Sequence, residues 1–566
     1  MKFFCIYCIA LTFLCTHAAA QPVTFSWMHH SGGIYSDAGT NIATDAAGNV
    51  YVAGHFRDSL NFNSSLPGGF LVGVSDFDIF IVKYDSSGQF RWSIHLGATG
   101  NEFVKSINID SSGRLLVAGS FEDPMDFDPD TSTAMLYATG FNSVFMACYD
   151  TSGNYQWANV IGGNYGVYAN DMAVSPSGEI FLLGTFRGTA DFDPSGSSAL
   201  YFSSFPALYV GRYDSDGNYI SVMRLIDTIV GTSIDIDLSS AVYITGYFTG
   251  AADFDPSPSN AVNFNTSATI SDLFIAKYTA AGNYVWARQI GAAGPEEGAA
   301  IQSDALGNLY VCGWFNGTVD FDPGPGVQNI TSLADDAFVS RFDTAGSLIW
   351  INTMGSTGHD YLRSLDLTPL GTLCAAGSFY AICDVDPSSN TVNLNAPGYA
   401  MFIVGYDTAT GNYQWSAAPE NSMESIPTEV SVSRTGSIHL AGYYSQDVDF
   451  DPGVGVALAV GYPFNQDMFA VKYTLNSVSG IDDELSAASI ESYPNPSTGH
   501  VSIDLDQQSE EVTVLVYDAE GKCISKAMYR NTARIELDIA GAAGVYFVSI
   551  QPENGVARQV KVIKTQ

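Results

Sequence analysis

Short apolar runs separated by turns rich in Asp and Gly fill the chain from about residue 21 to residue 475. LLVAGSF (115–121) and FIVKYDSSGQF (80–90) contain such runs, and DSSGR (110–114) is a typical turn. Apolar and polar positions that alternate over a few residues are typical of half-buried β-strands. Tight turns of Asp and Gly join antiparallel neighbours. The pattern therefore predicts an all-β protein.

An acidic phrase, Asp-Phe-Asp-Pro, marks a repeat within this region. The phrase begins at Asp126, Asp191, Asp253, Asp320 and Asp449, with the variants DVDP at Asp384 and NFNS at Asn61. From Asn61 onward, successive copies are therefore 65, 65, 62, 67, 64 and 65 residues apart. Each repeat contains four apolar runs, and a radial array of four-stranded sheets is a β-propeller. Seven repeats predict a seven-bladed β-propeller with four strands per blade.

The two ends of the repeat region complement each other. A Trp four residues after a turn Gly lies in the last run of five repeats: Trp92, Trp157, Trp286, Trp350 and Trp415. The third repeat has Ser221 there, and the seventh stops near residue 480 without such a run. The missing run stands at residues 23–33, around Trp27. We expect this N-terminal strand to close the last blade, so that no sheet edge is left exposed.

Composition agrees with an exported β protein. The chain has 55 Gly, 31 Tyr and 34 Phe, with only 14% charged residues. Residues 1–20 combine Lys2, an apolar run and three Ala before Gln21, which predicts a signal peptide. No later apolar run approaches the 18 residues of a membrane span, so we expect no transmembrane segment. We also expect the protein to be a monomer in solution.

The chain is strongly acidic, with a formal net charge of −37. Lys2 lies in the first 20 residues, and residues 481–566 hold 7 basic and 13 acidic residues. The remaining residues, 21–480, hold 14 basic and 46 acidic residues, a net charge of −32. Such a surface repels phosphate backbones and argues against nucleic-acid binding. It also attracts divalent cations.

Residues 491–566 follow a linker (476–490) and have their own pattern of alternating strands and tight turns, which predicts a small Ig-like β-sandwich. Their motifs resemble the type A sorting domain of the type IX secretion system, and the repeats resemble propellers of secreted Bacteroidota proteins. The matching positions are Tyr493, Pro494, Asn495, Pro496, Gly499, Gly544, Tyr546, Lys561 and Lys564. The resemblance implies export by the type IX machinery, removal of this domain, and attachment to surface lipopolysaccharide or release.

No familiar catalytic or zinc motif occurs in the sequence. The His residues lack HExxH spacing, no GxSxG elbow is present, and the five Cys after residue 20 lack metal-ligand spacing. Cys374 and Cys383 are close enough in sequence to form a disulfide, and otherwise they are small buried apolar residues.

The acidic phrase has two interpretations. In extended chain its two Asp residues point to one face, about 6.7 Å apart, where converging carboxylates can share a calcium ion. Alternatively, Asp before Pro sets a β-turn by accepting backbone N–H groups, which accounts for the second Asp of each copy but not for the first. Unit one, with Asn61 and Asn63, would bind calcium least. The candidate calcium ligands are Asp126, Asp128, Asp191, Asp193, Asp253, Asp255, Asp320, Asp322, Asp384, Asp386, Asp449 and Asp451.

One column of the repeat varies freely among His55, Ser120, Thr185, Tyr247, Trp314, Ser378 and Tyr443. Its aromatic members fit either packing between blades or a carbohydrate-binding surface. Two further irregularities are GPEEG (294–298) and GHDY (358–361).

These features favour a secreted or cell-surface binding or adhesion module without catalytic activity. Its expected partners are the type IX machinery and an extracellular glycan or protein. The alternative is an extracellular carbohydrate-active hydrolase or lyase with its site in the propeller channel, because a propeller fold does not determine function.

Overall fold

The computed structural model describes residues 23–74, 76–129, 132–266, 270–369, 371–419, 423–461 and 465–475. In the C-terminal part it describes 492–493, 497, 499–517, 523–540, 542, 544–552 and 558–565. The expected signal peptide, the linker and Pro494, Asn495 and Pro496 lie outside these ranges. Every regular element within them is a β-strand, so the described residues include no helix able to cross a bilayer.

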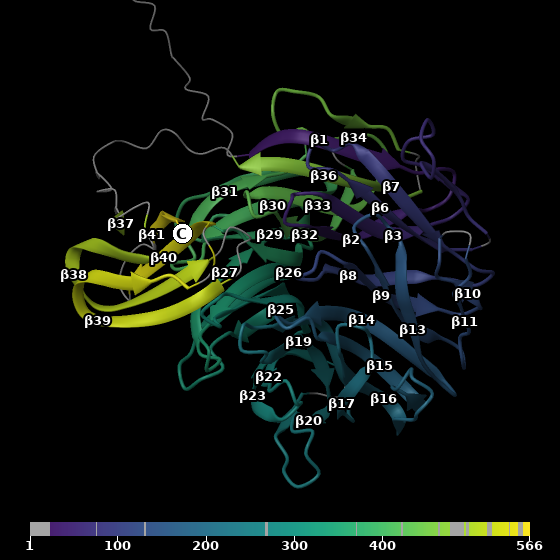
Figure 1. Ribbon diagram of the computed structural model, residues 1–566, viewed down its shortest axis with the longest axis horizontal. Coiled ribbons are helices and arrows are strands. Elements are labelled where there is room, and N and C mark those ends of the chain that lie inside the picture. Colours follow the sequence, from purple (N-terminus) through teal and green to yellow (C-terminus); the bar gives the residue numbers. More distant parts are fainter. Residues whose placement is uncertain are drawn as a thin grey trace, which may run out of the picture.

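The repeats form seven antiparallel four-stranded units (Figure 1). In the first six units the four strands follow one another in the chain. Units one to four are β2(Ala38–Thr44), β3(Val50–Phe56), β6(Asp78–Tyr84), β7(Phe90–Leu96); β8(Phe103–Ile109), β9(Leu115–Phe121), β12(Ser143–Tyr149), β13(Tyr155–Gly163); β14(Gly166–Val174), β15(Ile180–Asp191), β16(Leu200–Tyr213), β17(Tyr219–Leu225); and β18(Ile229–Ile236), β19(Val242–Thr249), β22(Ser271–Tyr278), β23(Tyr284–Ile290). Units five to seven are β24(Glu296–Ser303), β25(Leu309–Asp320), β26(Asn329–Phe342), β27(Leu348–Met354); β28(Tyr361–Leu367), β29(Thr372–Asp384), β30(Asn393–Asp407), β31(Tyr413–Ala417); and β32(Glu424–Val432), β33(Ser437–Ser445), β36(Asp467–Leu475), β1(Val23–Ser31).

The seventh unit is completed by the start of the chain. Strand β1 pairs antiparallel with β36, from Val23 opposite Leu475 to Ser31 opposite Met468. The strand predicted around Trp27 is therefore present, and it leaves β36 paired on both sides.

The first strands of the units form a closed ring. Each contacts the first strand of the next unit, in the order β2, β8, β14, β18, β24, β28 and β32, and β32 contacts β2. Units two and three are further bridged by β13 with β15, and units six and seven by a parallel bridge between β30 and β32. The ring surrounds a central channel of about 620 Å³.

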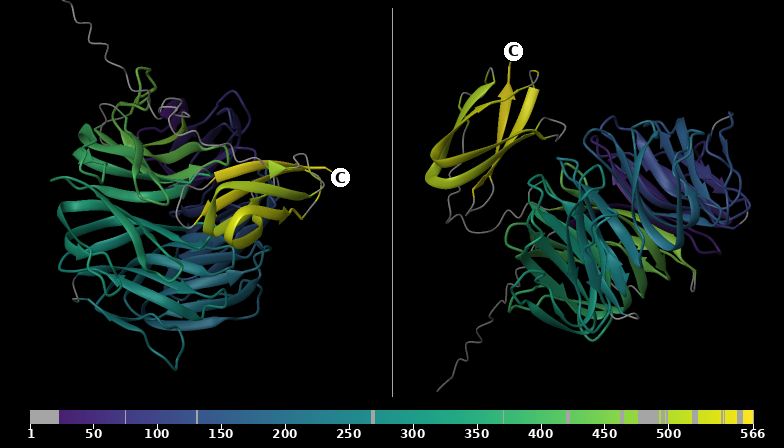
Figure 2. Two further views of the ribbon diagram at one scale, coloured as in Figure 1. Left: turned by 90° about the vertical axis from the view of Figure 1, so that its left-hand side faces the viewer. Right: turned by 90° about the horizontal axis from the view of Figure 1, so that it is seen from below.

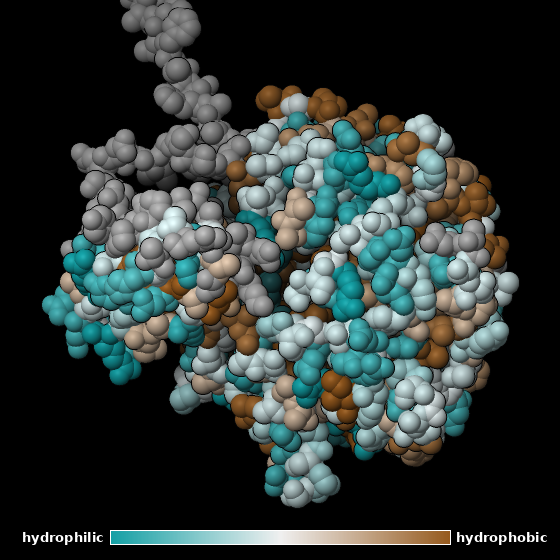
Figure 3. All heavy atoms as spheres, in the orientation of Figure 1, coloured by the Kyte–Doolittle hydropathy of each residue, from teal (hydrophilic) through white to brown (hydrophobic). Residues whose placement is uncertain are grey.

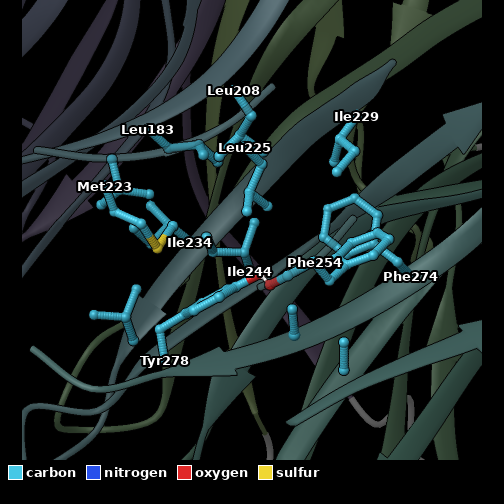
Figure 4. Packing of buried hydrophobic residues seen from close by; sticks show 14 of the residues in the cluster. Leu183, Leu208, Met223, Leu225, Ile229, Ile234, Ile244, Phe254, Phe274 and Tyr278 are labelled. Atoms are coloured by element: carbon cyan, nitrogen blue, oxygen red, sulfur yellow. Dashed lines mark hydrogen bonds between the residues drawn. The ribbon is translucent and has the colours of Figure 1, made fainter. Parts of the chain in front are cut away.

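The hydrophobic core lies mainly between neighbouring units. Figure 4 shows Leu183, Leu208 and Met223 of unit three packed towards Ile234 and Tyr278 of unit four. Comparable buried clusters occupy the other junctions. Burial of apolar area between units is therefore the main stabilising contribution to the ring.

A short hairpin extends each unit between its second and third strands. Four of these hairpins are separate pairs: β4(Ser59–Asn61) with β5(Phe70–Val72), β10(Met125–Asp126) with β11(Met135–Leu136), β20(Ala251–Asp253) with β21(Asn263–Asn265), and β34(Val448–Asp449) with β35(Leu458–Ala459). In units three, five and six the long second and third strands supply the hairpin. The first Asp of every acidic phrase, or Asn61, is the last residue of the outgoing strand.

The C-terminal residues form one five-stranded sheet, drawn in yellow in Figure 2. Its strands are β37(Ser492–Tyr493), β38(His500–Tyr517), β39(Cys523–Asp538), β40(Gly544–Pro552) and β41(Arg558–Lys564). The pairing of β38 with β39 breaks between Asp504 and Ser509, while the second half of β38 also pairs with β40. Buried Val, Ile and Leu side chains from these strands form a separate small core.

Candidate binding site at the mouth of the central channel

The first Asp of each acidic phrase closes its hairpin loop. Asp126 Oδ1 accepts the backbone N–H of Asp128 at 3.1 Å and that of Ala134 at 2.7 Å. The same pair of hydrogen bonds recurs at Asp191, Asp253, Asp320, Asp384 and Asp449. The first Asp thus has a structural role that the sequence interpretation could not assign.

The rest of the phrase anchors this loop. The second Asp accepts the N–H two residues further on, at 2.7–2.9 Å, in five copies: Asp193, Asp255, Asp322, Asp386 and Asp451. The residue between the two Asp is fully buried in six copies: Phe127, Phe192, Phe254, Phe321, Val385 and Phe450. In five of these copies its carbonyl accepts a tyrosine hydroxyl from the third strand, as in Tyr149 to Phe127 at 2.9 Å; unit five has Phe342 in place of the tyrosine.

The turn interpretation therefore extends to both Asp residues. Among the described residues, no group of three or more His, Cys, Asp or Glu side chains is placed to hold a metal ion. Calcium binding by the twelve phrase carboxylates stays a prediction.

Cys374 and Cys383 do not form a disulfide, and both are buried free thiols. They lie on the same strand, β29, nine residues apart. A straight extended strand of that length measures about 30 Å, far beyond disulfide reach.

The variable column splits into two kinds of environment. His55 packs edge-on against Phe77 of its own unit and Phe103 of the next, at 5.1 and 5.2 Å between ring centroids, and burial lowers its pKa to about 4. Ser120 and Ser378 are buried. Trp314 makes an edge contact with Tyr361 of the next unit at 5.8 Å. Packing between units accounts for these positions. Trp314 and Tyr443 of this column also lie close to Arg363 and Glu297.

A β-bulge at the same register position in every first strand places one extra residue against the channel. These residues are Thr40, Lys105, Asn170, Thr232, Ala299, Arg363 and Thr428. Lys105 and Arg363 are exposed, and they are the cations of this otherwise neutral set.

Arg363 lies within an aromatic and charged group that we name the channel-mouth cluster: Glu297, Trp314, Tyr361, Arg363 and Tyr443. The Arg363 guanidinium lies 5.6 Å from the centre of the Tyr361 ring. Burial raises the pKa of Glu297, while Arg363 and a hydrogen bond from Trp314 lower it. Burial also raises the pKa of Tyr443, and Arg363 opposes that shift. Three units thus contribute side chains that meet around one exposed guanidinium.

Asp335 supports this cluster from the third strand of unit five. Its Oδ2 accepts the Tyr361 hydroxyl at 2.8 Å and lies 2.8 Å from His359 Nδ1, and its Oδ1 accepts Asn316 Nδ2 at 2.9 Å. These hydrogen bonds lower the pKa of Asp335 and hold the Tyr361 ring in place. GHDY (358–361), noted above as irregular, supplies both His359 and Tyr361.

Deeper in the channel, carboxylates join neighbouring units. Asp171 accepts Ser106 Oγ on one oxygen and both Ser233 Oγ and the Ile234 N–H on the other, each at 3.0 Å, so it links three units. Burial raises its pKa to about 6. Glu429 accepts the Ile42 N–H at 2.7 Å, and burial together with Asp171 and Asp366 raises its pKa to about 8. Asp235 and Asp366 likewise accept N–H groups of the following unit. Asp171 and Glu429 occupy one repeat column, and Asp235 and Asp366 another. The sequence pattern did not indicate these four acids, because the other five members of each column are neutral.

The sorting-signal positions that the structure describes lie in the C-terminal sheet. The Gly499 N–H donates to Ser497 Oγ at 2.9 Å, with a φ of 124° that favours glycine. Lys564 Nζ donates to the Ile539 carbonyl at 2.8 Å, and the Tyr546 hydroxyl donates to the Ala542 carbonyl at 2.7 Å. Tyr493, Gly544 and Lys561 lie in β37, β40 and β41.

Residues 491–565 match the family described as a secretion system C-terminal sorting domain. The protein is secreted to the cell surface by the type IX secretion system. This agrees with the resemblance noted in the sequence, and the match includes all nine sorting-signal positions.

The repeats are similar to two longer curated proteins. The chain is 22% identical over 503 residues to the uncharacterized WD repeat-containing protein L264 of Acanthamoeba polyphaga mimivirus, covering 74% of this chain and 36% of that protein. It is 24% identical over 429 residues to the regulatory protein FlaEY of Caulobacter vibrioides, covering 71% and 42%. The chain therefore spans less than half the length of these relatives.

Two solved structures were also matched. A protein of unknown function from Dyadobacter fermentans is 9% identical, with 80% of this chain and all of that chain covered and a TM-score of 0.33. The extracellular domain of a putative hybrid two component system from B. thetaiotaomicron is 13% identical, with 93% and 80% covered and a TM-score of 0.22.

Proposed function

We propose that residues 21–475 are a seven-bladed β-propeller, displayed outside the cell by an Ig-like sorting domain (491–566) at the end of a linker (476–490). The closed ring of first strands and the strand supplied by β1 support this architecture. The type IX signal accounts for the destination of the chain.

We propose that this propeller is a binding or adhesion module that recognises an extracellular glycan at the channel mouth. The observation that carries the proposal is the channel-mouth cluster. The exposed Arg363 lies over the Tyr361 ring, Trp314 packs edge-on against Tyr361, and Tyr443 is close enough for Arg363 to lower its pKa. Aromatic faces with a few fixed polar groups are typical of small-ligand sites.

The charge of the cluster narrows the ligand class. The chain has 22 Lys and Arg against 59 Asp and Glu, so an exposed Arg and Lys facing one channel are unusual in their surroundings. A guanidinium binds a carboxylate through two parallel hydrogen bonds. The cluster therefore fits a glycan that carries carboxylate groups, such as a polyuronate, better than a neutral one.

Binding of the full chain to immobilised acidic and neutral polysaccharides tests this proposal. We expect Arg363→Ala and Trp314→Ala to weaken binding to acidic polysaccharides at least tenfold. Thr232→Ala, at the same bulge position of unit four, should bind like the parent chain. Binding that is equal in all four proteins, or absent, would contradict a glycan site at the channel mouth.

A second candidate function is a carbohydrate-active enzyme, favoured by the raised pKa of Glu429 in the channel. Against it, the channel carboxylates that we describe accept backbone N–H groups of neighbouring units. Release of new reducing ends or unsaturated products by the parent chain, lost in Glu429→Gln, would establish this alternative.

A further inference from the structure

Buried acids occur in matched pairs where neighbouring units meet. One column is the third-strand residue opposite Phe56 and its equivalents, and it contains Asp78, Ser143, Ala207, Asp272, Asp336, Ala400 and Asp467. The other column, in the first strand of the next unit or just before it, contains in the same order Glu102, Val167, Ile229, Glu296, Asp360, Ser425 and Asp37. These strands contact each other at all seven junctions.

The two columns change together. Where the third strand has Asp, the next unit has Asp or Glu, which happens at four junctions; where it has Ser or Ala, the next unit has Val, Ile or Ser. We name the four acidic cases the acid junctions. If each carboxylate only accepted nearby N–H groups, single acids would also occur. Acids that appear only in facing pairs indicate that the two carboxylates act on something between them.

The paired acids are buried and close enough to repel each other. Asp78, Glu102 and Glu296 are fully buried. In all four junctions the charge of one partner raises the pKa of the other, in addition to the effect of burial. Two buried like charges are costly without compensation.

Several carboxylate oxygens at these junctions have no hydrogen-bond donor. They are Asp78 Oδ1, Glu102 Oε1 and Asp336 Oδ1, together with one oxygen of Glu296, whose other oxygen faces the Ala292 N–H. The partnered oxygens are oriented by neutral donors or His: Asp78 Oδ2 by the Val74 N–H at 2.6 Å and His95 at 2.7 Å, and Glu102 Oε2 by the Ala98 N–H at 3.1 Å. The free oxygens of Asp78, Glu102 and Asp336 are thus left for another partner, whereas both oxygens of Asp37 and Asp360 already accept backbone N–H groups.

The surroundings add negative charge. Asp123 and Glu122 act on Glu102, and Asp335 acts on Asp336. His95 faces Asp78 and His359 acts on Asp360. In the described part of the chain, no Lys or Arg forms an ion pair with the six acids of the junctions after units one, four and five. A single shared proton would leave such a junction negative, whereas a divalent cation balances the pair.

A glycine makes room for each third-strand Asp. Gly97, Gly291, Gly355 and Gly32 follow the outer strand of the four units concerned, and a Cβ at any of them would collide with the carboxyl group. In unit three, where the third strand has Ala207, Ile226 stands at this position. Every third-strand Asp is therefore accompanied by this glycine, which also occurs once without an acid, at Gly162 beside Ser143 in unit two.

We propose that each acid junction binds one divalent cation of the hard, oxygen-preferring kind, such as Ca²⁺, between the third-strand Asp of one unit and the facing acid of the next. Such an ion accepts carboxylate, carbonyl and water oxygens in flexible geometry. It would cross-link neighbouring units at four of the seven junctions, including the junction of unit seven with unit one that closes the ring. This proposal is independent of the glycan site.

The test is calcium binding by the full chain, measured by calorimetry, together with thermal unfolding in calcium and in chelator. We expect about four calcium ions per chain and unfolding several degrees higher in calcium than in chelator. The double variant Asp272→Ala with Glu296→Ile copies the natural Ala207/Ile229 junction, so its fold is compatible with the ring. It should bind one calcium ion fewer, and in chelator it should unfold no lower than the parent chain because a buried repulsion is gone.

The matched control is Asp320→Asn with Asp322→Asn, in the acidic phrase of unit five, which should keep all four calcium sites. Loss of calcium in this control with full binding in the junction variant would overturn the proposal. Absence of both heat and thermal shift would also overturn it. If acidification raises the unfolding temperature in chelator while calcium does not, the junctions share protons and bind no cation.

Discussion

At the scale of single residues, the acidic phrase stabilises its hairpin through two kinds of hydrogen bond. Its Asp carboxylates accept backbone N–H groups, and the carbonyl between them accepts a Tyr hydroxyl. The Tyr278 hydroxyl donates to the Phe254 carbonyl at 3.0 Å within a fully buried site. In unit one, whose phrase is NFNS, the equivalent Tyr84 hydroxyl is buried and has no hydrogen-bond partner. The buried Tyr hydroxyl thus stabilises unit four through its hydrogen bond, whereas in unit one it is buried without a partner and lowers stability.

Tyr278→Phe should lower the free energy of unfolding by about 1 kcal/mol, because it leaves the buried Phe254 carbonyl without its donor. Tyr84→Phe is the control and should be neutral or slightly stabilising, since it removes an unsatisfied buried hydroxyl. Denaturant unfolding of the two variants and the parent chain measures both changes. Equal destabilisation by the two substitutions would show that the carbonyl bond contributes nothing specific.

The second Asp of the phrase was predictable from the sequence, because its turn partner lies two residues away. The first Asp was not, because its second partner, for example Ala134 for Asp126, lies eight residues further and is brought back by the hairpin. The paired acids of the acid junctions were still less predictable from the sequence. GPEEG contains Glu296, but Asp272 lies on another unit, and only the closed ring brings the two together.

At the scale of strands, β1 links the last unit to the first. Its Trp27 ring lies 5.9 Å from that of Tyr84 in unit one and 6.1 Å from His439 in unit seven, and His29 Nε2 lies 2.6 Å from the Gly88 carbonyl. Three other outer-strand tryptophans, Trp92, Trp286 and Trp350, donate to a carbonyl in the turn of the next unit. Trp27 Nε1 has no such partner, and His29 makes the contact with this turn instead. The borrowed strand therefore repeats at the closure what the other outer strands do within the chain.

Removal of residues 23–33 should expose the edge of β36 and open the contact between units seven and one. We expect a lower unfolding temperature and concentration-dependent association, because an unpaired edge strand pairs with other chains. Light scattering after size-exclusion chromatography and thermal unfolding measure the two effects. A synthetic peptide of residues 23–33 should reverse both, and a truncated chain that stays monomeric and equally stable would rule out closure by β1.

At the scale of the whole molecule, the strands of most of the chain could be predicted because one pattern is repeated seven times. Strands that are ambiguous in one unit can be identified from the equivalent residues of the others. The channel could not be predicted in this way, because Asp171, Asp235, Asp366 and Glu429 are exceptions to that pattern. On the face in Figure 3, hydrophobic residues lie mainly towards the rim, among hydrophilic ones. The differences between units on which our two proposals rest lie along the ring axis and at the junctions.

The channel acids should make stability depend on pH. Burial and the facing acids Asp171 and Asp366 raise the pKa of Glu429 from 4.5 to about 8, while the Ile42 N–H and Asn41 oppose the shift. Since the folded pKa is above the unfolded one, this stabilising contribution is complete below about pH 4.5 and is lost as pH rises through about 8. Channel water screens the charge, so we expect a loss on the order of 2 kcal/mol.

Glu429→Gln should make this decline shallower, because an amide keeps a hydrogen bond to the Ile42 N–H and does not ionise. The remaining decline comes from the acid junctions, where burial raises the pKa of Glu102 to about 7 and that of Glu296 to about 8. Glu424→Gln, on the same strand but bonded to Ser445 Oγ outside the channel, should retain the parent pH profile. Urea unfolding of the three proteins between pH 5 and 9 in the presence of chelator separates this effect from cation binding at the acid junctions. A parent chain whose stability is constant across that range would mean that Glu429 stays ionised, with the channel hydrated enough to solvate it.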